Sequence, residues 1–225
     1  MDQPGIDGER YRRVMKGLAR INYLTRSAAL FWPSIRRLAS ELPGRTLTLL
    51  DVATGAGDIP VWLARRARMS GIDLRISACD ISPQAIDHAR EHAKRRDAAV
   101  TFFVHDAVAA GIAEPYDIVT SSLFLHHLDD DPCLEVLRSM SAATRRMLLV
   151  SDLLRSRTNY WMAYLGVRIL TRSDVMYVDG PRSVEGAFAW DEVRQLCRQA
   201  GLESAELARR WPCRYVLRWR RRGLA

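Results

Sequence analysis

The sequence of 225 residues has few cysteines and no long hydrophobic run. Its four cysteines are far apart, form no CxxC pair and lack the spacing of metal ligands, which argues against structural zinc. The longest apolar stretch, residues 161–170, contains Arg168 and is too short for a transmembrane helix. The N-terminus lacks the charged and then apolar pattern of a signal peptide. Together these absences predict a reduced, cytoplasmic protein.

The composition is that of an ordinary folded domain. Hydrophobic residues make up 48% and charged residues 27% of the chain, which excludes intrinsic disorder and suits one α/β domain. The net charge of +8 lies at the two ends: residues 1–45 hold nine basic and four acidic residues, and residues 201–225 hold seven and two. Such ends could favour an anionic membrane surface, a partner enzyme or nucleic acid, or could simply be solubilising arginines.

From residue 46 onward, short apolar runs alternate with helical patterns. Strand–helix alternation predicts βαβ units and a parallel sheet that is covered on both faces. We expect strands over 46–52, 74–79, 100–104, 116–121 and 146–153, helices over 59–68, from 82, over 131–142 and over 190–200, and a final hairpin from 202–207 and 214–219. The predicted fold is α/β: a Rossmann-like, doubly wound, mostly parallel seven-stranded sheet with a C-terminal antiparallel hairpin.

Two regions fall outside this alternation. Residues 1–45 are predicted to form an N-terminal helical cap, with Pro33 interrupting the helical pattern. Residues 155–187 are aromatic and without clear periodicity, so we expect an irregular substrate lid there. The remaining chain, residues 46–225, would be the catalytic domain that carries this lid.

The sharpest motif is a glycine turn between the first strand and the first helix of the alternating region. Gly55 and Gly57 stand in the sequence Asp-Val-Ala-Thr-Gly-Ala-Gly-Asp, where glycine allows the backbone to approach a nucleotide closely. Asp80 ends the second predicted strand and Asp106 follows the third. Carboxylates at the carboxyl ends of successive parallel strands line one crevice, which predicts a nucleotide-type cofactor.

The loop favours a sulfonium cofactor over a dinucleotide. The third glycine of the dinucleotide pattern is replaced by Pro60, and Asp58 would repel a pyrophosphate at the helix N-terminus. The carboxylates of Asp51 and Asp58 would instead help to bind a positively charged cofactor. These features predict S-adenosylmethionine.

Residues 46–153 resemble the class I S-adenosylmethionine-dependent methyltransferases. Residues 51–58 and 116–122 are similar to the glycine motif and the fourth-strand motif of the methyltransferases of ubiquinone and menaquinone biosynthesis. Those enzymes usually carry Arg-Asn where this chain has His126-His127. Residues 179–188 look more like small-molecule methyltransferases found beside type III polyketide synthases.

The resemblance implies a set of cofactor-binding residues. In these families the glycine loop holds the methionine end, the carboxylate after the second strand binds the ribose, and the carboxylate after the third strand accepts from the adenine amino group. By position these would be Asp51, Ala53, Gly55, Gly57 and Asp58 in the loop, Asp80 with Ile81 against the adenine, Asp106 with Ala107, and Ser121 where the fourth strand passes the reactive methyl.

Three residues are candidates for the chemistry. Methyl transfer is an in-line displacement helped by positioning, and a phenolic acceptor also benefits from a base. His126 or His127, after the fourth strand, could be that base, and Asp152, at the end of the fifth strand, could orient the histidine or the acceptor. Capping or turn roles are the alternatives. No metal is expected, because the histidines at 88 and 92 have no third ligand.

These features favour an enzyme that methylates a small lipophilic hydroxylated aromatic compound: a phenol, a quinol or a polyketide. Transfer to oxygen is favoured over ring carbon, because histidines replace the Arg-Asn of the quinone enzymes. A nucleic-acid substrate is disfavoured, because residues 121–124 read Ser-Ser-Leu-Phe and not the Asn/Asp-Pro-Pro-aromatic run that grips a flipped base. A cofactor-binding protein without catalysis is the third alternative.

Overall fold

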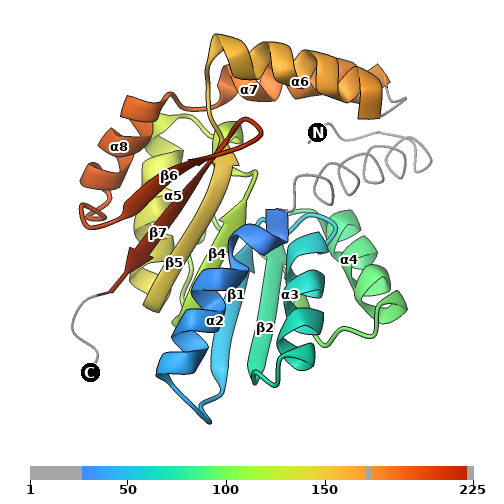
Figure 1. The fold of residues 1–225 in the computed structure, drawn as a ribbon, viewed down its shortest axis with the longest axis vertical. Helices are drawn as coiled ribbons and strands as arrows, with labels where there is room; N and C mark the ends of the chain where they lie inside the picture. Colours follow the sequence, from blue (N-terminus) through green and yellow to red (C-terminus); the bar gives the residue numbers. More distant parts are fainter. Residues whose placement is uncertain (1–26, 171–173, 222–225) are drawn as a thin grey trace.

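The computed structural model describes residues 27–170 and 174–221, and within them the chain forms one seven-stranded sheet. Its strand order is β3-β2-β1-β4-β5-β7-β6 (Figure 1). The strands are β1 (Leu47–Val52), β2 (Leu74–Asp80), β3 (Thr101–Val104), β4 (Tyr116–Ser122), β5 (Thr144–Leu153), β6 (Glu206–Arg210) and β7 (Arg214–Arg220). The first five pair in parallel, and β7 runs antiparallel to both β5 and β6. The predicted sheet and its C-terminal hairpin are confirmed.

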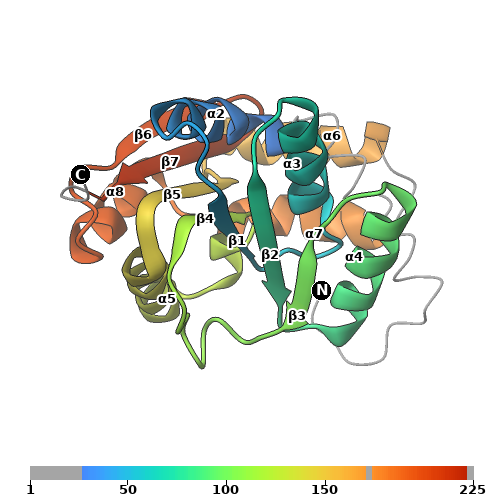
Figure 2. The same ribbon diagram turned by 90° about the horizontal axis from the view of Figure 1, so that it is seen from below.

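Helices cover both faces of the sheet (Figure 2). One face carries α2 (Trp32–Glu41), α3 (Asp58–Met69) and α4 (Pro83–Arg95), and the other carries α5 (Asp130–Ala143) and α8 (Trp190–Gln199). In β5, Met147 and Leu149 pack with the first group, whereas Leu148 and Val150 pack with the second. Because both faces are buried, the strand reads as a continuous apolar run and not as an alternation.

The first described residues, from Ser27 on, pack into this core. The short 3-10 helix η1 (Ser27–Leu30) packs against α3, and Phe31, Trp32 and Ile35 are buried against the sheet. Pro33 lies in the first turn of α2, where its missing N–H leaves no helical bond unmade. The predicted N-terminal cap otherwise falls on residues 1–26, outside the described residues, and the domain division stays a prediction.

The expectation that residues 155–187 are irregular is wrong, while their role as a substrate lid stays a prediction. Two helices, α6 (Arg157–Leu170) and α7 (Asp174–Gly186), occupy this region and lie across the top of the molecule in Figure 1. The aromatic residues carried the helical signal: Tyr160 and Tyr164 stand four apart and their rings stack at 6.5 Å. Exposed apolar residues such as Trp161 and Leu165 obscure this period in the sequence. In α7 a proline, Pro181, stands inside the helix, a position where proline is normally unfavourable.

The first strand of the predicted hairpin is displaced. It covers residues 206–210 and not 202–207. Leu202 is instead fully buried in the turn after α8, where its N–H donates to the Cys197 carbonyl. The apolar character of Leu202 thus reflects helix termination against the core. Among the described residues, no helix is long and apolar enough to cross a membrane.

Candidate active site

The glycine loop between β1 and α3 is held in an unusual backbone conformation. Ala53, Gly55 and Gly57 all have positive φ angles, of 55°, 54° and 74°. A Cβ atom on Gly57 would lie 3.0 Å from Ala89 Cβ and 3.1 Å from the Phe102 ring. Glycine is required at this position for two reasons, its left-handed backbone and the close approach of α4 and β3.

We expect Gly57→Ala to destabilise the fold more than an alanine at another left-handed glycine. Gly71 has a φ of 66° but open space around its missing side chain, so Gly71→Ala is the matched control. Both changes cost the left-handed backbone energy, about 1–2 kcal/mol, and only Gly57→Ala adds about 1–3 kcal/mol of overpacking. Urea unfolding measures both. Equal losses would show that the contacts with α4 and β3 are not tight.

Asp80 ties the glycine loop to the end of β2. Its Oδ2 accepts from Gly55 N at 2.8 Å, and its Oδ1 accepts from Ser82 N at 3.0 Å. The carboxylate therefore lies directly at the loop, at the carboxyl edge of the sheet. Here it could accept the hydroxyl groups of a ribose.

An exposed apolar surface surrounds Asp80. Ile81, directly after it, is 60% exposed. Val104, which pairs with Asp80 in the register of β2 and β3, is 50% exposed, and Val108 is 38% exposed. Large apolar side chains that are open to solvent beside a polar edge suit a flat ligand. Sequence reasoning found Ile81 but missed the two valines, whose signal was their position around Asp106.

Asp106 shapes the turn after β3. Its Oδ1 accepts from the N–H groups of Val108 and Ala109 at 2.9 and 3.0 Å, while Ala107 is buried in the core. The predicted adenine-side residues are thus brought to the same edge as Asp80. Together the loop, Asp80 and Asp106 could hold a cofactor with a ribose and a flat base.

Asp51 is buried at the end of β1. Its Oδ1 accepts from Thr120 Oγ1 at 2.6 Å and its Oδ2 from Thr54 Oγ1 at 2.7 Å. Burial raises its pKa to about 6, and the two threonine hydrogen bonds oppose this rise. Next to it, the buried Ser121 Oγ donates to the Val52 carbonyl. Asp51 therefore links β1 to both β4 and the glycine loop, and Ser121 links β4 to β1. The carboxylate and the Ser121 hydroxyl are both hydrogen-bonded.

Asp51→Asn should change how stability depends on pH. A carboxyl whose pKa is raised in the folded state favours folding when protonated, so its contribution is lost as the pH rises from about 4 to about 6. For wild type this amounts to at most about 3 kcal/mol. Between pH 4.5 and pH 7.5 the free energy of unfolding should fall less in Asp51→Asn than in wild type. Asp87→Asn, which changes an exposed carboxylate on α4, is the control, and identical slopes in all three proteins would contradict the assignment.

The two histidines lie in the short helix η2 (Leu125–His127) and differ in environment. His126 is buried, and its Nδ1 lies 2.6 Å from Asp152 Oδ1. Asp152 Oδ2 also accepts from the N–H groups of Phe124 and Leu125, at 3.0 and 2.6 Å. His127 is exposed, and its ring centroid lies 4.0 Å from that of His126. The structure thus brings the three predicted catalytic residues together at the carboxyl ends of β4 and β5.

Asp152 stays ionised in this setting. Burial opposes its ionisation, but the charge and hydrogen bond of His126 and the N–H groups of Leu153 and Leu125 keep its pKa below the usual value. An ionised Asp152 fixes the proton of His126 on Nδ1. The lone pair of a neutral His126 is then on Nε2.

The comparisons with known proteins agree with this arrangement. Residues 49–146 match the sequence model of a family described as a methyltransferase domain. This part of the chain is therefore similar in sequence to methyltransferase domains. It includes the glycine loop and the strands that carry Asp80, Asp106 and His126.

Curated relatives share parts of this domain. The release factor glutamine methyltransferase of Streptococcus pneumoniae is 37% identical over 76 residues, which are 34% of this chain and 25% of that protein. The tRNA 5-carboxymethoxyuridine methyltransferase of Escherichia coli K12 is 26% identical over 106 residues, 45% of this chain and 38% of that protein. The chain therefore spans well under half the length of these relatives.

A solved structure matches nearly the whole fold. The magnesium protoporphyrin IX methyltransferase of Synechocystis PCC 6803, with bound S-adenosylhomocysteine, superposes with a TM-score of 0.63 at 17% identity. The match covers 95% of this chain and 93% of that one. The seven-stranded sheet and the helices around it thus form an arrangement that this solved methyltransferase structure also has.

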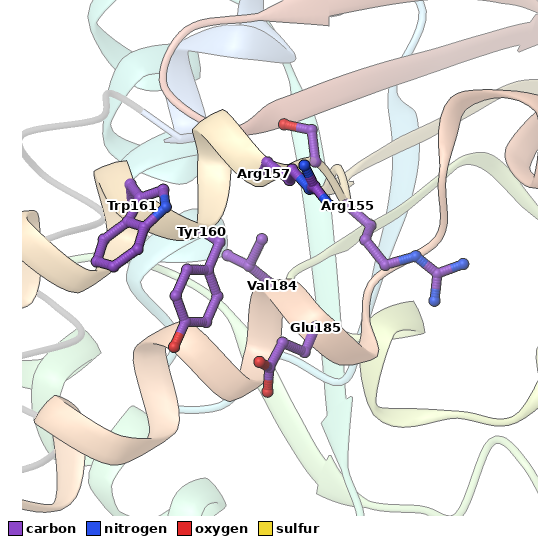
Figure 3. A pocket seen from close by; sticks show the side chains of 7 residues that line it. Arg155, Arg157, Tyr160, Trp161, Val184 and Glu185 are labelled. Atoms are coloured by element: carbon purple, nitrogen blue, oxygen red, sulfur yellow. The ribbon is translucent and has the colours of Figure 1, made fainter.

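A groove lies between the helices α6 and α7 and the end of β5. A cavity of about 530 Å³ lies where α6 and α7 meet the end of β5, lined among others by Arg155, Tyr160, Trp161 and Val184 (Figure 3). Its lining residues do not include the glycine loop or Asp80. Gly186 of α7 stands against η2, because a Cβ atom there would lie 3.1 Å from the His126 carbonyl oxygen. Val184 and Glu185, which line the groove, thus directly precede the part of α7 that contacts η2.

The remaining candidates have structural roles. His92 Nδ1 lies 3.2 Å from the Ala56 carbonyl and 3.5 Å from Asp58, in the first turn of α3, so it supports the glycine loop. In the parts of the chain that the structure describes, no cluster of residues could hold a metal ion. Burial raises the pKa of the Cys79 and Cys133 thiols to about 12, which makes them unreactive at neutral pH.

Proposed function

We propose that this protein is an S-adenosylmethionine-dependent methyltransferase that methylates a hydroxyl group of a small, lipophilic aromatic compound. The observation that carries the proposal is the buried His126–Asp152 pair, which lies at the same sheet edge as the glycine loop. A general base beside a cofactor crevice suits an acceptor that must lose a proton. The match to a magnesium protoporphyrin IX methyltransferase agrees with a small-molecule acceptor.

The residues present fit this cofactor. When bound, S-adenosylmethionine supplies an electrophilic methyl group on a positively charged sulfur. The loop carboxylates Asp51 and Asp58 favour a cation, and Asp58 in the first turn of α3 disfavours a phosphate there. The exposed Ile81 and Val104 offer apolar surface for the adenine beside Asp80, which would take the ribose.

On the acceptor side, His126 would take the hydroxyl proton at Nε2. Asp152 holds the ring by its Nδ1–H and stabilises the imidazolium that forms. Helices α6 and α7 cover this edge of the sheet, so they would exclude water from the reacting groups and position a flat acceptor. His127, more exposed, would contact the acceptor without being the base.

Transfer to nucleic acid is the second candidate, because one relative modifies tRNA. The contacts of the arginines near the C-terminus argue against a nucleic-acid substrate. Arg220 pairs with Glu41, and the Arg221 guanidinium donates to carbonyls at the end of α5. These arginines serve intramolecular contacts and are not presented as a phosphate-binding row. Contact of the basic ends with a membrane or a synthase, and a cytoplasmic location, remain predictions.

Incubation of a cell extract with the protein and methyl-labelled S-adenosylmethionine separates these functions. The extract is then divided into a small-molecule fraction, a nucleic-acid fraction and a protein fraction. We expect label in the small-molecule fraction, and none there with an Asp80→Ala variant. Label that follows RNA or protein would contradict the proposed acceptor, and no transfer to any fraction would contradict the activity.

A further inference from the structure

Arg214, the first residue of β7, is buried and forms no ion pair with a described residue. It is 4% exposed, and its Nη1 donates to the hydroxyl of Ser27 at 2.7 Å. No carboxylate within the described residues forms an ion pair with it. A buried guanidinium has five N–H donors, and one serine oxygen satisfies few of them. Buried charges in proteins are normally paired, so a buried guanidinium with no ion pair among the described residues is unusual.

Arg214 lies at the same end of β5 as Asp152. It pairs in register with Leu153, one residue beyond Asp152, and the charge of Asp152 acts on it. Its partner Ser27 lies in η1, which also packs against α3, the helix that follows the glycine loop. Arg214 and Ser27 therefore lie on the α2–α3 face of the sheet, at the edge where β5 ends.

Two further polar groups on this face lack partners. Ser122 at the end of β4 and Ser151 in β5 are register neighbours, and neither buried hydroxyl has a hydrogen bond. Paired residues of neighbouring strands project to the same face, so Ser151 also lies beside Val216, one side-chain step from Arg214. A guanidinium and two unpaired hydroxyls thus lie on one face of the sheet as buried donors, a set that suits an anionic group.

We propose that Arg214, held by Ser27, binds a carboxylate of the acceptor and so selects aromatic hydroxy acids. The inference rests on the proposed function. Guanidinium favours carboxylate because its two parallel N–H groups match the two oxygens. The cofactor also has a carboxylate, but its methionine end belongs at β1. Arg214 is three strands away, about 14 Å at the usual strand spacing.

The test measures binding of probe acids by calorimetry to protein saturated with S-adenosylhomocysteine. The probes are hydroxybenzoate, hydroxycinnamate and hydroxynaphthoate, each with its neutral carboxamide. We expect at least one acid to bind wild type ten or more times more tightly than its amide. Arg214→Met should abolish this preference, and Arg214→Lys should keep only part of it, because an ammonium cannot bind both oxygens in parallel.

The matched control is Arg210→Met, which removes an exposed arginine that pairs with Arg214 across the hairpin. It should leave the acid preference unchanged. Ser27→Ala provides a second variant should Arg214→Met not fold, with an expected severalfold loss of acid affinity. In every variant the affinity for S-adenosylhomocysteine should remain within about twofold of wild type.

Three results would overturn the proposal: no acid preferred over its amide by wild type, an equal preference in Arg214→Met, or a loss of S-adenosylhomocysteine affinity in that variant. The last would assign the guanidinium to the cofactor. Failure of the proposed function looks different. Wild type would then bind the acids in the same way but transfer no methyl group to any acceptor.

Discussion

His126→Ala is expected to lower turnover about 10²–10⁴-fold at neutral pH while cofactor binding is retained. The reason is the pair with Asp152, which fixes the proton on Nδ1 and leaves Nε2 to accept a proton from the acceptor. The loss should shrink at high pH, where a phenolic acceptor ionises without help. The measurement is the pH dependence of turnover, with S-adenosylhomocysteine affinity as the test of an intact cofactor site.

His127→Ala is the matched control, since it removes the neighbouring imidazole, which is exposed whereas His126 is buried. Its turnover should fall far less than that of His126→Ala. Asp152→Asn should follow His126→Ala in direction, because an amide does not enforce the same tautomer. Near-full turnover in both histidine variants would mean that neither is the base, and that the enzyme works by positioning alone.

Asp80→Ala is expected to weaken S-adenosylmethionine binding by about 2–4 kcal/mol, roughly 30- to 1000-fold. Two effects act together. The variant loses a charged acceptor for the ribose, and it also releases the Gly55 and Ser82 N–H groups that Asp80 holds. The glycine loop would therefore lose its fixed shape as well as its ligand contact. Calorimetry measures the affinity directly.

Asp80→Asn separates the two effects. The amide oxygen can still accept from the loop N–H, while the charge is gone, so we expect an affinity between those of wild type and Asp80→Ala. Asp87→Ala, an exposed carboxylate on α4, should bind the cofactor like wild type. Unchanged affinity in Asp80→Ala would refute the placement of the ribose.

Much of the cofactor edge could be predicted from sequence because it is local. Gly55, Gly57, Asp80 and Asp106 each follow a strand, and parallel strands bring their carboxyl ends to one edge without any further information. Asp152 was likewise predicted at the end of β5. Its distance to His126 was not, because 26 residues and the packing of β5 against β4 separate the pair.

The acceptor side escaped prediction for a physical reason. The contact between Arg214 and Ser27 joins residues 187 positions apart, through an antiparallel strand and a short 3-10 helix that carry no motif. In sequence, Arg214 is one of many arginines in a basic C-terminus. Only its burial distinguishes it. The helices α6 and α7 were missed because exposed apolar residues obscure the helical period of α6, and α7 contains Pro181.

The most direct test is carbon NMR of a cell extract incubated with the protein and S-adenosylmethionine labelled with ¹³C in its methyl group. We predict a new enriched resonance at the position of a methyl carbon bound to oxygen, in a small molecule that passes an ultrafiltration membrane. The resonance should be absent with Asp80→Ala and strongly reduced with His126→Ala. A resonance of a methyl on ring carbon, or label retained with macromolecules, would contradict the account.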